Sequence, residues 1–226
     1  MNTRIQTPTP NLEDSLNFYK QLGFTVVSDK NPILVSDGTI LIEINPNRFA
    51  RAGIKLFDEN WTFVLEQFKN VAPIANGHLL SDPSGTWIYL MEADQGTKLD
   101  RQIFPKSVLG NSMGVSLESI AFKDSITFYE KLGFKKEEGN LSQGWTSLKN
   151  KDGLIVTIMK DNACPHLFFN PSLTYFNGAK NEKVIETIRS LEIPITEEIT
   201  YFNSEGAVDN IIIRDPGGLG FFIFND

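Results

Sequence analysis

The chain is poor in the residues that build metal clusters and disulfide frameworks. Its 226 residues include one cysteine and two histidines. A zinc site of four cysteines or of two cysteines and two histidines needs more of these side chains than the sequence holds. The same is true of an iron–sulfur cluster and of a disulfide scaffold. All four kinds of site are therefore excluded.

The sequence also lacks long apolar runs and an excess of basic residues. No apolar stretch approaches the roughly 18 residues of a membrane helix, and the first residues lack the apolar core of a signal peptide. The 21 basic and 28 acidic side chains give a net charge of −7, and no Lys/Arg stripe is visible. We therefore expect no binding to nucleic acid or membrane. One cysteine and no export signal predict a cytoplasmic location.

What the sequence does contain is an internal repeat. The segment S-L-N-F-Y-K-Q-L-G-F at residues 15–24 returns 110 positions later as S-I-T-F-Y-E-K-L-G-F at residues 125–134. An Asp-Pro-x-Gly motif at residues 82–85 returns at residues 215–218. A spacing of this size is one small domain. We therefore predict two domains, residues 1–93 and 113–226, joined by a polar linker over residues 94–112.

Each copy of the repeat has the pattern of a helix between strands. In the first copy Asn11 is a suitable N-cap, apolar residues follow at three- and four-residue spacing, and Gly23 is suited to end the helix. Hairpin strands follow, with Asp37-Gly38 at the turn. A second unit is expected in each half, with a strand and then a helix. These lie at residues 53–57 and 58–70 in the first half, and at 173–176 and 180–191 in the second.

These motifs resemble those of the vicinal oxygen chelate superfamily, which includes glyoxalase I, extradiol dioxygenases and bleomycin resistance proteins. The resemblance covers nearly the whole chain. It implies an α+β fold in which four βαβββ units form two cup-shaped, mixed-sheet, glyoxalase-like domains in tandem. Because the matching residues belong to cores and turns, they indicate the fold and leave the chemistry open.

The resemblance also implies where a metal would be held. Glyoxalase-like members bind a divalent metal inside the cup through His, Glu or Gln on the first, fourth, fifth and eighth strands. Counting from the repeated motifs places these positions at Arg4, Glu43, Ile54 and Tyr89, and at Gly114, Thr157, Leu173 and Phe222. A catalytic cage needs about three or more protein donors, and only Glu43 is one. We therefore predict no metal and no cofactor.

Arg4 and Glu43 are the candidate ligand-binding pair in the first cup. The planar fork of arginine suits an anionic or carbonyl group of a ligand, whereas the alternative is a structural ion pair that fills a former metal site. Trp87 and Tyr89 share one face of a strand and would line the same cup, which suits a flat or apolar ligand or a filled interior. The second cup has no charged candidate and is expected to be packed. No catalytic residue is assigned.

These observations predict a protein that binds a small molecule in a metal-free first cup, as the resemblance to bleomycin resistance proteins implies. The alternative is a metal-dependent or metal-free lyase, isomerase or dioxygenase of the same superfamily, in which Glu43 would be the base of a metal-free lyase or isomerase. A structural pseudo-enzyme without a ligand is also consistent with the residues. The four units in one chain are compatible with a monomer or a homodimer.

Overall fold

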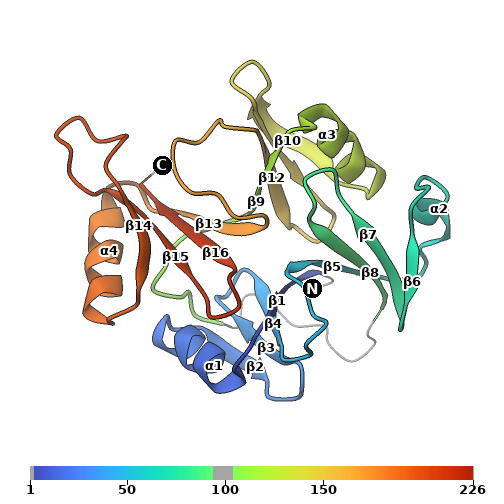
Figure 1. Cartoon of the computed structure of the whole chain (residues 1–226), viewed down its shortest axis with the longest axis horizontal. Coiled ribbons are helices and arrows are strands. Elements are labelled where there is room, and N and C mark those ends of the chain that lie inside the picture. The colour runs from blue at the N-terminus through green and yellow to red at the C-terminus, as the bar shows by residue number, and fades with distance from the viewer. Residues whose placement is uncertain (1–2, 94–103, 226) are drawn as a thin grey trace.

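Each half of the chain forms its own set of strands and helices (Figure 1) in the computed structural model, which describes residues 3–93 and 104–225. The first half contains β1 (Thr3–Pro8), α1 (Leu12–Gln21), β2 (Thr25–Ser28), β3 (Ile33–Ser36), β4 (Leu41–Asn45), β5 (Gly53–Asp58), α2 (Thr62–Leu65), β6 (Ala72–Ile74), β7 (Gly77–Ser81) and β8 (Trp87–Glu92). The second contains β9 (Ser112–Ser119), α3 (Phe122–Lys131), β10 (Lys135–Asn140), β11 (Trp145–Lys149), β12 (Ile155–Lys160), β13 (Ser172–Phe176), the 3-10 helix η2 (Gly178–Lys180), α4 (Asn181–Ser190), β14 (Ile195–Ile199), β15 (Asn210–Arg214) and β16 (Gly220–Phe224). Residues 94–103 of the predicted linker lie outside the described residues.

The strands form two eight-stranded mixed sheets with the same topology. The first sheet has the order β2-β3-β4-β1-β5-β8-β7-β6, and the second has the order β10-β11-β12-β9-β13-β16-β15-β14. In each sheet two strand pairs are parallel and the remaining pairs are antiparallel. The parallel pairs are β1 with β4 and β5 with β8 in the first sheet, and β9 with β12 and β13 with β16 in the second. The predicted α+β fold of two tandem domains is therefore confirmed.

The first helix begins and ends as its sequence predicts. The side-chain oxygen of Asn11 accepts hydrogen bonds from the backbone N–H groups of Glu13 and Asp14, so Asn11 is the N-cap. Gly23 follows the last turn with φ 78°, a left-handed conformation that favours glycine. The helix buries Phe18 and Tyr19, which supply its apolar face.

The helix expected over residues 58–70 is wrong in length. Only α2, a single turn of four residues, is helical, and none of its side chains is buried. Phe63 on this turn is 79% exposed. Val64 and Leu65 of this turn are only partly buried against the core, so a longer helix gains little stabilisation from packing here. In contrast, α4 buries Ile185 and Ile188 and runs for ten residues. No helix among the described residues has the length and apolarity needed to cross a membrane.

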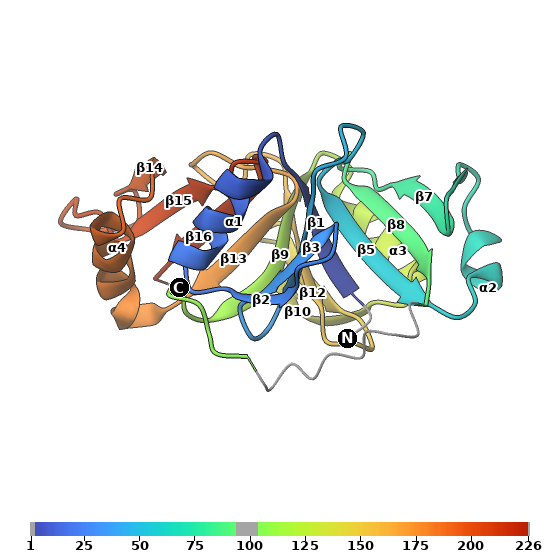
Figure 2. The ribbon, with the colours of Figure 1, turned by 90° about the horizontal axis from the view of Figure 1, so that it is seen from below.

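The helix of each domain is bonded to the Asp-Pro-x-Gly turn of the other domain. The Tyr19 hydroxyl donates to Oδ2 of Asp215 at 2.9 Å, and the Tyr129 hydroxyl donates to Oδ2 of Asp82 at 2.9 Å. Figure 2 shows α1 beside β16 and α3 behind β5 and β8. A third bond, from the Tyr175 hydroxyl to Asp37 at 2.7 Å, also joins the domains. The two repeats therefore share one core and are related by approximate two-fold symmetry.

Because of these buried tyrosines, the free energy of unfolding is expected to fall steeply above about pH 10. Burial, and then a nearby carboxylate, raises the pKa of Tyr19, Tyr129 and Tyr175 well above its ordinary value. When folding raises the pKa of a tyrosine, the protonated tyrosine contributes to the free energy of unfolding, and this contribution is complete at a pH below the pKa of the unfolded state. Above it, that stability is lost by about 1.4 kcal/mol per tyrosine for each pH unit. Urea unfolding between about pH 9 and 11.5 measures the slope.

The variant Tyr175→Phe serves as the control for this pH dependence. It should remove one of the three contributions and make the loss of stability with pH correspondingly shallower. If absorbance shows these tyrosines ionising near pH 10 while the protein stays folded, the expectation is wrong.

Candidate functional site

The first cup holds a buried cluster of charged side chains. Arg4 on β1, Glu43 on β4 and Lys55 on β5 point to the same concave face of the sheet. Glu43 is 2% exposed, and its two carboxylate oxygens face different cations. Oε1 pairs with the Lys55 ammonium, and Oε2 lies 3.5 Å from Nη1 of Arg4. The predicted pairing of Arg4 with Glu43 is present, whereas ligand binding by this pair stays a prediction.

Lys55 was missed by the sequence analysis, which placed the fifth-strand position at Ile54. Successive residues of a strand point to opposite faces. Ile54 is fully buried in the core, and Lys55 faces the cup. The same shift of one residue moves the position in the second domain from Leu173 to Thr174. The lysine inside the apolar strand G-I-K-L-F at residues 53–57 is the sequence feature that indicates Lys55, and not Ile54, as the residue facing the cup.

The first cup is also covered by the loop that joins β4 to β5. The carbonyl oxygen of Arg51 in this loop accepts hydrogen bonds from Nε2 of Gln6 at 2.8 Å and from the Tyr89 hydroxyl at 3.3 Å. Lys55 Nζ lies 5.5 Å from the centre of the Tyr89 ring. Burial raises the pKa of Tyr89 above its ordinary value. Trp87 begins β8 and is 37% exposed, so it does not join the cluster.

The second cup, in contrast, contains a cavity of about 200 Å³. Two hydroxyl pairs lie among its lining residues: Ser116 with Thr174 at 2.6 Å, and Ser147 with Thr157 at 2.7 Å. Most of the remaining wall is apolar and consists of Met113, Trp145, Ile155, Met159 and Phe176; among the described residues its one charged member, Glu138, is exposed on β10. The expectation that this cup is packed is therefore wrong.

The cavity arises because smaller side chains stand at the matching positions of the second sheet. The strand registers match Arg4 with Gly114, Gln6 with Ser116, Leu34 with Ser147, Glu43 with Thr157, and Lys55 with Thr174. At Gly114 only glycine fits, since φ is 96° and an added Cβ would lie 2.3 Å from the carbonyl oxygen of Ile155. The same fold thus has one filled cup and one hollow cup.

Comparison with solved structures identifies this architecture. A variant of homoprotocatechuate 2,3-dioxygenase from B. fuscum matches with a TM-score of 0.62 and 14% identity, over 100% of this chain and 70% of that one. A catechol 2,3-dioxygenase matches with a TM-score of 0.57 and 13% identity over 98% and 86% of the two chains. LapB from Pseudomonas sp. KL28, a 2,3-dioxygenase, gives 0.55 and 15% over 97% and 89%. The chain has the tandem vicinal oxygen chelate fold.

At these identities the similarity establishes the fold alone. No protein-family model matches the sequence, and no curated protein is significantly similar to it. The structural neighbours named above are 2,3-dioxygenases, and the similarity of this chain to them concerns the fold.

The residues in the cups of this vicinal oxygen chelate fold do not fit a divalent metal. In the first cup the carboxylate that the described residues supply, Glu43, already faces the positive charges of Lys55 and Arg4. In the second cup the matching positions carry hydroxyls and a glycine. Among residues 3–93 and 104–225, no group of three or more His, Cys, Asp or Glu side chains is placed to hold a metal ion. The donors that these residues supply therefore do not match those of a divalent metal site.

Aromatic side chains from the loop between β12 and β13 fill the other half of the second cup. The Phe168 ring lies 4.9 Å from that of Phe222, and the His166 ring lies 5.3 Å from Phe222 and 5.2 Å from Phe224. In the same loop, burial raises the pKa of the Cys164 thiol to about 11. A thiol with this pKa is almost entirely protonated at neutral pH and is a poor nucleophile.

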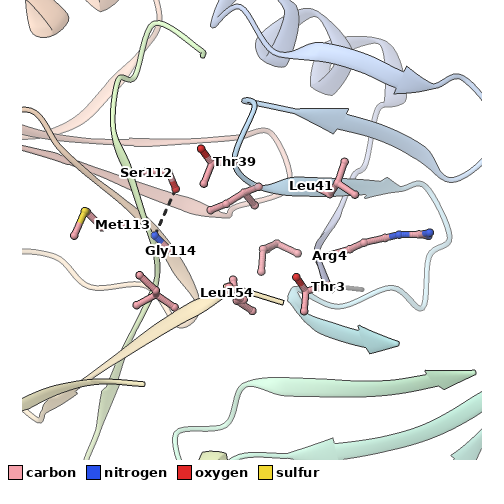
Figure 3. A pocket seen from close by; sticks show the side chains of 12 residues that line it. Thr3, Arg4, Thr39, Leu41, Ser112, Met113, Gly114 and Leu154 are labelled. Carbon is pink, nitrogen blue, oxygen red and sulfur yellow. Dashed lines mark hydrogen bonds between the residues drawn. The ribbon is translucent and has the colours of Figure 1, made fainter. Parts of the chain in front are cut away.

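A second, much smaller cavity lies between the domains, where β1 approaches β9 (Figure 3). Its volume is about 40 Å³, and its lining includes Thr39, Leu41, Met113 and Leu154. The Arg4 side chain extends away from it, as Figure 3 shows. One water needs about 10–15 Å³ on this measure, so the cavity has room for a few waters and not for an organic ligand.

Proposed function

We propose that this protein binds a small, uncharged, mostly apolar molecule, about the size of one substituted aromatic ring, in the cup of the second domain. The cavity of about 200 Å³ carries the proposal. An apolar cavity of about 150 Å³ is known to hold benzene, so this one has room for a ring with one or two substituents. Trp145 and Phe176 supply flat surfaces for such a ring.

The hydroxyl groups that line the cavity favour a ligand that carries a hydrogen-bonding group. Ser116 pairs with Thr174 and Ser147 pairs with Thr157, and a hydroxyl can rotate to donate to a ligand or accept from it. We therefore favour a ring that carries a hydroxyl over a hydrocarbon. Catechol, for which one structural neighbour is named, is a single ring with two hydroxyls.

A catechol-type dioxygenase is the second candidate function, because the structural neighbours are dioxygenases. The donor set of the two cups argues against it, since neither cup offers the donors that a divalent metal needs. Metal analysis of protein purified without chelator, followed by oxygen uptake with catechol, separates the two functions. Stoichiometric iron or manganese together with oxygen uptake would replace the binding proposal by the dioxygenase.

The variant Ser147→Leu is expected to weaken binding of phenol and catechol at least tenfold. Leucine is the residue that fills the matching position in the first cup, Leu34, which is 5% exposed. The added methyl groups would occupy the cavity without breaking a backbone hydrogen bond. Isothermal titration calorimetry with the two probes measures the change.

Thr196→Leu is the control, since Thr196 is exposed on β14 and far from the cavity lining. It should leave the affinity for both probes unchanged. If wild-type protein binds neither probe at millimolar concentration, or if Ser147→Leu binds as well as wild type, the cavity is not the binding site.

A further inference from the structure

The approximate symmetry of the two domains creates two equivalent grooves, one at the end of α1 and one at the end of α3. The groove at α1 is filled by the chain itself, through residues 107–111. The backbone N–H of Val108 donates to the carbonyl oxygen of Leu22 at 2.9 Å, and Leu109 is fully buried. The side chain of Asn177 donates to the Leu109 carbonyl at 3.0 Å. An extended segment therefore docks in this groove through backbone bonds and one buried apolar side chain.

The groove at α3 is built in the same way, but no residue of 3–93 or 104–225 fills it. Leu132 and Gly133 correspond to Leu22 and Gly23. An added Cβ on Gly23 would lie 3.7 Å from the nitrogen of Val108, whereas one on Gly133 would have no atom within 4 Å. Within the described parts of the chain, no backbone N–H group donates to the Leu132 carbonyl.

This second groove has the size and the apolar wall to receive a peptide. A cleft of about 240 Å³ lies between α3 and the first domain, with Leu56, Trp61, Val64 and Leu132 in its lining. It continues past Gly133 and Asn150 into a shallower cleft of about 380 Å³. The wall of this groove is therefore apolar around the place that corresponds to Leu109 in the groove at α1.

The charge around the groove selects the kind of partner. Asp58, Glu137 and Asp152 are its acidic residues. Glu137 is paired with Lys149 at 2.8 Å, and Asp58 is paired with Lys151. The lining lysines outnumber these acids, although the whole protein has a net charge of −7; they are Lys131, Lys135, Lys136, Lys149 and Lys151. A local surplus of lysine on an acidic protein favours an acidic partner.

We propose that the groove at the end of α3 docks an extended acidic segment of a partner protein. Its backbone would donate to the Leu132 carbonyl, as Val108 does to Leu22. A branched apolar side chain would lie against Val64 and Trp61, and acidic side chains would meet Lys131, Lys135 and Lys136. This site is separate from the cavity of the second cup, so the two proposals can be tested independently.

The test uses a fluorescently labelled octapeptide with the sequence of residues 104–111 and glutamate in place of Pro105, Lys106 and Asn111. Its anisotropy is measured against the full chain at low salt. We expect saturable binding that is weakened at least tenfold by the triple variant Lys131→Glu, Lys135→Glu, Lys136→Glu. The matched control, Lys30→Glu, Lys123→Glu, Lys183→Glu, reverses three exposed lysines elsewhere and should bind like wild type. A peptide with aspartate in place of leucine, the residue that is buried in the groove at α1, should also lose at least tenfold.

Three results would overturn the proposal. They are no saturable binding up to about 1 mM peptide, equal binding by the triple variant, and cross-links that place the chain's own residues 94–103 in the groove. Thermal melting checks that the triple variant is folded. If it is not, Val64→Arg on the apolar wall replaces it, with the same tenfold loss expected.

Discussion

Replacing Lys55 by methionine is expected to lower the free energy of unfolding by about 3 kcal/mol. Lys55 and Glu43 are 9% and 2% exposed, so their charges are almost wholly removed from water. Methionine keeps most of the volume of the side chain and removes its charge. Glu43 would then be buried with only Arg4, at 3.5 Å, to balance it. An uncompensated buried charge costs much more than the intact pair contributes. Urea unfolding at neutral pH measures the difference.

The double variant Glu43→Leu with Lys55→Met distinguishes the cost of a lone charge from the value of the pair. It removes both charges of this pair and leaves Arg4, and it should recover most of the stability that Lys55→Met loses, since buried ion pairs can often be replaced by apolar residues of similar volume. Arg4→Ala should have a smaller effect than Lys55→Met, although it also removes the stacking of Arg4 on Phe57 at 4.5 Å. A loss below about 0.5 kcal/mol for Lys55→Met would show that water reaches Glu43.

The features that the sequence predicted correctly are those set by local chemistry or by repetition. Asn11 caps its helix and Gly23 ends it, because both depend on residues close in the chain. The two domains were visible because the helix and turn motifs recur. The helix over residues 58–70 failed because its formation depends on packing against the sheet, which the sequence does not display.

The errors in the candidate site have two physical origins, which are strand register and side-chain volume. A shift of one residue assigned the cup-facing position of the fifth strand to Ile54 in place of Lys55. The cation that neutralises Glu43 was therefore not identified from the sequence. The hollow second cup was missed because the positions were compared by charge and not by volume. Once the registers match Leu34 with Ser147 and Lys55 with Thr174, the missing volume can be read from the residues.

The two cups show how one fold can carry two roles in a single chain. In the first domain Arg4, Glu43 and Lys55 pair with one another inside the cup and fill this part of it. In the second domain the matching residues are small and leave space for a ligand. The helix of each domain is bonded to the last hairpin of the other, so the filled domain also supports the hollow one.

This mutual support predicts that Asp215→Ala lowers the free energy of unfolding by about 3 kcal/mol. The Asp215 carboxylate accepts hydrogen bonds from the Thr7 hydroxyl at 2.7 Å, the Tyr19 hydroxyl at 2.9 Å and the Leu219 N–H at 2.7 Å. Alanine would leave these buried donors without an acceptor, at about 1–3 kcal/mol each. Burial of Asp215, which raises its pKa, opposes part of this loss, because removal of the carboxylate also removes its desolvation cost.

Asp215→Asn tests whether the loss comes from the missing acceptor. Asparagine keeps one side-chain oxygen for the donors from the first domain, so it should lose less stability than alanine. Asp29→Ala, at an exposed position, is the control and should change the free energy of unfolding by less than about 0.5 kcal/mol. Urea unfolding followed by tryptophan fluorescence reports both domains, since Trp61 and Trp87 lie in the first and Trp145 in the second. If Asp215→Ala unfolds at the same urea concentration as wild type, the hydrogen bond between Tyr19 of α1 and the β15–β16 turn does not hold the domains together.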